Sequence, residues 1–177
     1  MSKPKLIILS DIFGATEEAW MGMYRKQLSP FFEIVEYDSR QLAGILPCPQ
    51  EEVHQRFVNA GIEDATQRLS LLEEKVYAVL GFSVGGTIAW RYALENPHCS
   101  SLYLISATRL RNETVRPTSA ISLCYGEHES SGPNLAWFDT LGIAPKIFKN
   151  EFHECYKNEA VITQLCQTII EDSNILG

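Results

Sequence analysis

The sequence predicts an α/β fold, in which a mostly parallel six-stranded sheet lies between two layers of helices as a three-layer sandwich. Short apolar runs recur along the chain, and stretches with helical periodicity separate them. Several runs, KLIILS and VYAVL among them, are almost entirely apolar, as expected for strands covered on both faces. The 177 residues contain no internal repeat and no low-complexity tract. Residues 1–177 are therefore expected to form a single domain.

The six strands are expected where the apolar runs lie. Residues 33–38 (EIVEYD) alternate between polar and apolar side chains, which favours a position nearer an edge of the sheet. The other strands are expected at residues 5–10, 76–80, 102–106, 120–125 and 144–149. Helical stretches cover residues 16–28, about 51–73, 84–95 and 159–171, with a short helix within 133–141. In such a sheet, ligands bind at the carboxyl ends of the strands.

The composition argues against several classes of partner. A formal net charge of −7 disfavours a sequence-wide attraction to nucleic acid or to an anionic membrane. No stretch approaches the roughly 18 apolar residues of a membrane span, and the apolar run 6–9 is too short for the core of a signal peptide. The five cysteines are an odd number without CxxC spacing, which is typical of reduced thiols. A cytoplasmic protein is expected, and its oligomeric state stays open.

The pentapeptide GFSVG (residues 81–85) lies between an apolar run and a helical stretch. A catalytic serine in this arrangement sits in a strained turn that lifts its hydroxyl above the sheet, and the flanking glycines permit close packing. The following helix directs its first N–H groups toward any anion that forms beside the serine. The pattern favours Ser83 as a nucleophile. The alternative is a small residue in a tight packing turn.

Two longer segments resemble the alpha/beta-hydrolase family, and the resemblance covers nearly the whole chain. VLGFSVGGTIAWRYALENPHCSSLYLIS (79–106) resembles that family's nucleophile turn, helix and next strand. LIILSDIFGATEEAW (6–20) resembles its strand and loop usually written around a His-Gly pair, where this chain has Asp11-Ile12 instead. An acidic residue followed by Ile-Phe-Gly resembles the dienelactone hydrolase branch.

The resemblance implies two backbone N–H groups as donors to an oxyanion, those of Phe13 and Val84. Backbone donors do not depend on side-chain identity, so the replacement of the His-Gly pair does not remove them. The conformation of the loop is the open point, because Ile12 cannot adopt the positive φ that is open to glycine.

Family members carry their catalytic residues in the order serine, acid, histidine. His153 follows the last expected strand and directly precedes the final helix, where the family places its histidine; a surface histidine in a polar loop is the alternative. Glu129 takes the position of the family's aspartate, three residues after Gly126, and an ordinary solvated acidic loop is the alternative. Glu127 is its nearest competitor. The other histidines, His54, His98 and His128, lie at positions that do not suit the base.

The link of residues 107–119 (ATRLRNETVRPTS) is too short for the multi-helix lid that family members carry there. An open, shallow site favours small or flexible acyl substrates. Ile12, Phe82 and Arg109 are the residues expected to contact such a substrate. Arg109 shares the link with Arg111 and Arg116, and the three either attract an anionic leaving group or form a solvated loop.

These patterns predict a serine hydrolase that cleaves carboxylic ester or thioester bonds through acylation of Ser83, with His153 as base and Glu129 as its partner. No histidine or carboxylate pair shows the spacing of metal ligands, so neither metal nor cofactor is expected. The expected partner is a small acyl substrate. The alternative is a non-catalytic binding protein that retains the fold.

Overall fold

The computed structural model describes residues 3–15 and 19–173. Its sheet has six strands in the order β2-β1-β3-β4-β5-β6, and every neighbouring pair is parallel. The predicted α/β class and six-stranded sheet are confirmed. The strands are β1 (Lys5–Leu9), β2 (Glu33–Tyr37), β3 (Ala78–Phe82), β4 (Ser101–Ile105), β5 (Ala120–Gly126) and β6 (Lys146–Phe148).

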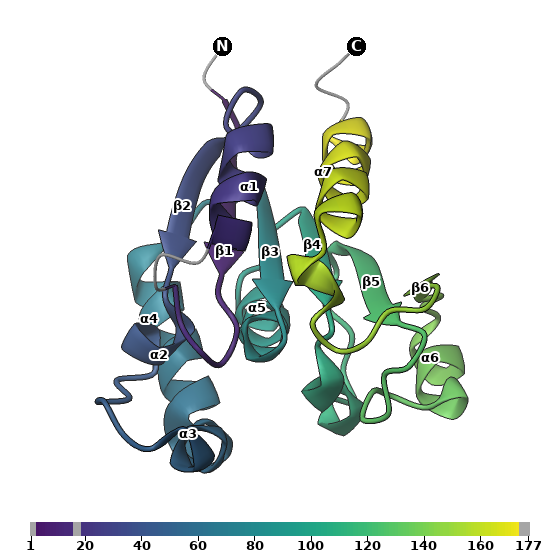
Figure 1. Cartoon of the computed structure of the whole chain (residues 1–177). Coiled ribbons are helices and arrows are strands. Elements are labelled where there is room, and N and C mark those ends of the chain that lie inside the picture. The colour runs from purple at the N-terminus through teal and green to yellow at the C-terminus, as the bar shows by residue number, and fades with distance from the viewer. Residues whose placement is uncertain (1–2, 16–18, 174–177) are drawn as a thin grey trace.

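Helices cover both faces of the sheet (Figure 1). One face is covered by α1 (Ala19–Leu28) and α7 (Glu159–Asp172), which pack against each other and against the apolar side chains of that face. The other face is covered by α4 (Ile62–Leu72), α5 (Val84–Glu95) and α6 (Leu135–Leu141). Because side chains alternate along each strand, the two faces form two separate hydrophobic cores.

The expected helix of residues 51–73 is in fact a composite. It consists of α3 (Gln50–Arg56), a π-helical turn η1 (Phe57–Gly61) and α4. A short helix α2 (Ser39–Leu42) precedes it, with Asp38 as N-cap. The first residues of the helix expected at 16–28, residues 16–18, lie outside the described part of the chain.

The remaining elements follow the expected ranges closely. Helix α5 matches its expected range, whereas β3 begins two residues later than expected and continues through Phe82. Two short 3-10 helices complete the chain, η2 (Thr108–Asn112) and η3 (Cys155–Lys157). All five cysteines are free thiols, four of them buried. Within residues 3–15 and 19–173, no helix is long and apolar enough to cross a membrane.

The strand order places two loops side by side. The chain winds from β1 outward to β2, then returns across β1 to β3 and continues in the opposite direction. The carboxyl ends of β1 and β3 therefore lie next to each other at the point where the order reverses, which is where α/β sheets bind ligands. The loop after β1 carries Asp11 and Ile12, and the turn after β3 carries Ser83.

Candidate active site

Ser83 forms a strained turn between β3 and α5. Its φ of 51° and ψ of −115° lie outside the regions that L-residues ordinarily occupy. The flanking glycines make this turn possible: a β-carbon at Gly81 would lie 2.6 Å from the Gly85 carbonyl oxygen, and one at Gly85 would lie 2.5 Å from that of Ser10. The strained turn presents the Ser83 hydroxyl to a cavity at the carboxyl end of the sheet.

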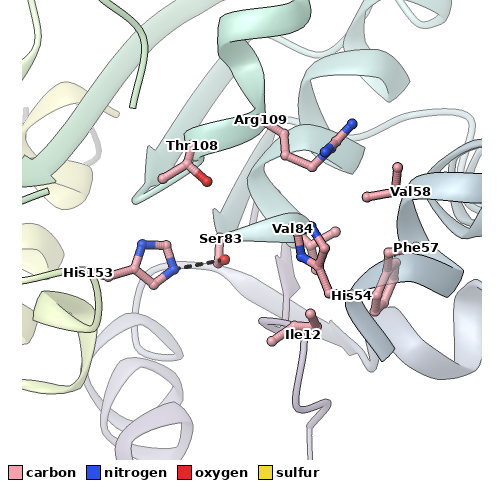
Figure 2. Close-up of a pocket in the computed structure, with 9 residues that line it drawn as sticks. All are labelled: Ile12, His54, Phe57, Val58, Ser83, Val84, Thr108, Arg109 and His153. Carbon is pink, nitrogen blue, oxygen red and sulfur yellow. Dashed lines mark hydrogen bonds between the residues drawn. The ribbon is translucent and has the colours of Figure 1, made fainter. Parts of the chain in front are cut away.

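Two side chains from loops later in the chain form a line of contacts that begins at Ser83. The Ser83 Oγ atom lies 3.1 Å from Nε2 of His153 (Figure 2). On the other side of the same ring, Nδ1 lies 2.5 Å from Oε2 of Glu129, whose side chain is 7% exposed. The sequence predicted these three residues for one site, and the structure brings them together. A carboxylate at Nδ1 holds the ring in the tautomer whose Nε2 accepts a proton from the serine.

The loops that carry Glu129 and His153 pack backbone against backbone. Gly126 ends β5, and a β-carbon there would lie 2.5 Å from the carbonyl oxygens of both Glu151 and Phe152. The His128 N–H donates to the Glu151 carbonyl at 2.9 Å. This contact sets the position of the histidine relative to the acid.

Glu127, the competing acid, is engaged elsewhere. Its carboxylate accepts hydrogen bonds from the ammonium of Lys149 at 2.7 Å and from the N–H of Asn150 at 2.9 Å. The Asn150 N–H and the Lys149 ammonium lower the pKa of Glu127. Glu127 therefore connects the two loops at the surface. It is Glu129 that contacts the ring of His153.

Ser106, for which the sequence gives no role, supports His153 through a hydrogen bond to its backbone. Ser106 follows β4 with a positive φ of 54°. Its hydroxyl donates to the carbonyl oxygen of His153 at 2.6 Å and lies 3.6 Å from Sγ of Cys155. No motif marks this residue in the sequence; its position at the end of the strand between β3 and β5 is the signal that could have found it.

The loop after β1 requires a correction. Asp11 is 1% exposed, and its Oδ1 accepts the N–H of Phe13 at 2.9 Å. This bond turns the Phe13 amide toward its own chain, and Phe13 does not line the cavity. The expectation that the Phe13 N–H points at a reacting oxyanion is therefore not met. Ile12 lines the cavity instead, together with Ser83 and Val84.

Asp11 also connects this loop to the segment after His153. Its Oδ2 accepts the hydroxyl of Tyr156 at 3.0 Å, and Nζ of Lys157 lies 3.7 Å away. Burial and the charge of Asp11 raise the pKa of Tyr156, so the phenol stays protonated and donates. The acidic residue that replaces the family's histidine is thus a buried brace between two loops of the site.

The cavity has a volume of about 160 Å³. Of the residues expected to contact substrate, Ile12 and Arg109 line it (Figure 2). Phe82 does not. Its ring is fully buried on the opposite face of the sheet, 4.9 Å from the ring of Trp20 and 4.8 Å from that of Tyr24. The alternation of β3 turns Phe82 to the face opposite the cavity, so its role is in the core.

Four lining residues were missed from the sequence: His54, Phe57, Val58 and Thr108. Three of them come from α3 and the π-helical turn η1, a type of turn frequent at functional sites. From the sequence, His54 is expected at a position that does not suit the base, and it is not expected at the cavity. A topological signal could have corrected this, since the connection after β2 starts at the same sheet edge as the site.

Metal-ligating side chains do not cluster within residues 3–15 and 19–173. No group of three or more histidine, cysteine, aspartate or glutamate side chains there could hold a metal ion.

A family model described as the alpha/beta hydrolase fold matches residues 37–141, more than half of the chain. The chain belongs to the alpha/beta hydrolase family. No curated protein matches it.

Solved structures share this fold at low identity. A dienelactone hydrolase-like promiscuous phosphotriesterase from metagenomic libraries has a TM-score of 0.72 and 13% identity, over 96% of this chain and 85% of that chain. An alpha-beta serine hydrolase homologue from Coxiella burnetii has a TM-score of 0.66 and 14% identity, over 97% and 86%. The esterase domain of a Rhodothermus marinus protein has a TM-score of 0.64 and 12% identity, over 96% and 85%. These likenesses concern the fold.

Proposed function

We propose that the protein is a serine hydrolase that cleaves ester or thioester bonds of small acyl substrates, with Ser83 as nucleophile, His153 as general base and Glu129 as its acidic partner. The observation that carries the proposal is the chain of contacts from Ser83 Oγ to His153 Nε2 at 3.1 Å and from Nδ1 to Glu129 at 2.5 Å. A serine hydroxyl becomes a useful nucleophile when a positioned base takes its proton and a third group orients that base.

The reaction follows from these contacts. Ser83 Oγ attacks the acyl carbon while His153 Nε2 takes the hydroxyl proton, and Glu129 stabilises the imidazolium that forms. The same Nε2 gives the proton to the leaving alcohol or thiol. Water then attacks the acyl-enzyme with His153 again as base, which releases the acid and restores Ser83.

The tetrahedral oxyanion needs two hydrogen-bond donors. Val84 is the first residue of α5, so its N–H has no intrahelical acceptor. The second donor in this proposal is the N–H of Ile12, because Ile12 lines the cavity and the Phe13 amide is bound to Asp11. Removing one such donor typically costs about 10²–10³-fold in kcat.

Labelling with a fluorophosphonate probe tests the nucleophile without a known substrate. Wild type should be labelled, Ser83→Ala should not, and the control Ser119→Ala should be labelled like wild type, because Ser119 donates to the Cys99 carbonyl far from the cavity. A matched pair tests the acid: Glu129→Gln should lower kcat on a reactive ester by about 10³–10⁴-fold, and Glu127→Gln far less.

Two results would overturn the proposal. One is a folded wild-type protein that the probe leaves unlabelled and that turns over no member of a panel of short oxygen esters and thioesters. The other is equal labelling of wild type and Ser83→Ala. The first would leave the non-catalytic binding protein as the function, and the second would place the reactive nucleophile at a residue other than Ser83.

A further inference from the structure

Arg109 differs from the other arginines of its link. It extends from η2 over the cavity that holds Ser83 and His153 (Figure 2). In the part of the chain that the structure describes, its side chain makes no hydrogen bond and no ion pair, and its Nε is buried without a partner. By contrast, Arg111 donates to the carbonyls of Thr108 and Ser131. Arg116 donates to the carbonyls of Leu141 and Gly142.

The surroundings of Arg109 leave its positive charge uncompensated. Partial burial and the nearby charges of Arg111 and Arg91 lower the pKa of Arg109. Glu113 acts in the opposite direction, but its carboxylate lies 2.8 Å from the guanidinium of Arg91. A buried donor without an acceptor costs free energy, and an anion in the cavity would supply the acceptor.

We propose that the cavity binds an acyl ester or thioester that carries a second, free carboxylate on its acyl part, and that Arg109 holds this carboxylate. The inference rests on the proposed hydrolase function. A guanidinium is planar and offers parallel donors that match a carboxylate. Both groups line one cavity, so one small molecule can reach Ser83 with its ester and Arg109 with its acid.

The volume of the cavity limits the size of the substrate. About 160 Å³ is well below the about 300–1,000 Å³ of pockets for drug-sized ligands. The class is therefore a half-ester or half-thioester of a short dicarboxylic acid. For monomethyl glutarate, hydrolysis consumes one water and yields glutarate dianion, methanol and one proton, which a pH-stat records.

The first experiment compares monomethyl glutarate with its neutral isostere, the methyl ester of glutaramic acid, at fixed ionic strength. Wild type should favour the carboxylate in kcat/KM, and Arg109→Met should reduce this preference by at least about tenfold, the scale of a lost hydrogen bond between charged groups. Arg109→Lys should retain part of the preference. Arg40→Met, the control, removes the same charge at a residue outside the cavity and should leave the preference unchanged.

The second experiment measures binding in the absence of turnover. Glutarate is titrated into Ser83→Ala by calorimetry, with glutaramide as the neutral comparison. Glutarate should bind, glutaramide should bind at least about tenfold more weakly, and Arg109→Met in the Ser83→Ala background should abolish the difference. Circular dichroism melting curves establish that each variant is folded.

The outcomes separate the two proposals. If the fluorophosphonate probe leaves wild type unlabelled and no ester or thioester of the panel is cleaved, but glutarate binds through Arg109, the hydrolase function fails and the carboxylate site stands. If both esters are cleaved at equal kcat/KM and glutarate does not bind, the hydrolase stands and the carboxylate site is overturned. A preference that survives Arg109→Met and Arg109→Lys alike also overturns it.

Discussion

The hydroxyl of Ser106 donates to the backbone carbonyl of His153 at 2.6 Å, although neither residue belongs to the other's loop. Ser106 directly follows β4, which lies between β3 and β5, the strands that precede Ser83 and Glu129. One partly buried hydrogen bond thus holds the backbone of His153 at a set distance from the end of β4. Ser106 acts through His153 and is a positioning residue.

Ser106→Ala should lower kcat by about two- to tenfold with little change in KM, because one neutral hydrogen bond contributes about 0.5–1.5 kcal/mol. Ser106→Gly should show the same loss, since it relieves the positive φ but lacks the hydroxyl. Ser119→Ala is the matched control: it removes a buried serine bond at the opposite end of the sheet and should lower stability without lowering kcat. Steady-state kinetics on one reactive ester decide between a positioning role and a merely structural one.

The carboxylate of Asp11 should contribute to stability through its bonds to the Phe13 N–H and the Tyr156 hydroxyl. Asp11→Asn keeps the shape but replaces one acceptor by a donor, so urea unfolding should show a loss of about 1–3 kcal/mol. Glu52→Gln is the comparison, because it removes an exposed ion pair with Arg56 and should cost less than about 1 kcal/mol. Equal losses in the two variants would contradict the role of Asp11 as a brace.

Phe82 should affect stability and leave substrate preference unchanged. Phe82→Leu removes part of a ring packed against Trp20, Tyr24 and Tyr156, and should cost about 1–3 kcal/mol in urea unfolding. Ile12→Ala, in contrast, alters the cavity wall and should change KM. A changed acyl-chain preference in Phe82→Leu would show that Phe82 touches the substrate after all.

Alkaline pH should destabilise the protein through its buried thiols. Burial raises the pKa of Cys99 and of Cys124 to about 11. A raised pKa in the folded state means that the folded protein holds its protons while the unfolded chain releases them. Stability is therefore fully present below the unfolded pKa of about 8.5–9 and falls as the pH rises toward 11.

Urea midpoints at pH 7.5, 9 and 10 measure this loss. Cys99→Ala should lose less stability than wild type over the interval, because one of the raised groups is gone. Cys48→Ala, which alters a half-buried thiol, should follow the wild-type slope. A Cys99→Ala slope equal to that of wild type would refute the thiol contribution.

Local patterns were sufficient to predict the sheet, and together with the resemblance to the alpha/beta-hydrolase family they predicted the candidate triad. Continuous apolar runs mark strands that are buried on both faces, and β1 and β4 lie within one residue of their expected ranges. Ser83, Glu129 and His153 each follow a strand, and parallel strands bring their carboxyl ends to one edge. The family's order of serine, acid and histidine, applied to these strand ends, therefore predicted that the three residues meet.

The remaining site residues depend on geometry that sequence patterns do not record. Whether Phe82 faces the cavity depends on which face of β3 each side chain takes. The Phe13 amide donates to a side chain two residues earlier, that of Asp11, through a turn that the sequence does not mark. His54 reaches the cavity because η1 and α3 pack beside the reversal point of the sheet. Each of these is a property of tertiary packing.

The arrangement of Ser83, Glu129 and His153 also bears on when the proposed activity should appear during folding. Ser83 and His153 are 70 residues apart in sequence, and His153 and Glu129 are 24 apart. Parallel pairings between distant segments close late and slowly, because the entropy of loop closure must be overcome before the contacts form. Helical content should therefore return early on refolding. Reactivity toward the probe should return only when β3, β4, β5 and β6 have paired in their native register. Labelling of Ser83 by the probe would then report the time at which the last contacts of the fold form.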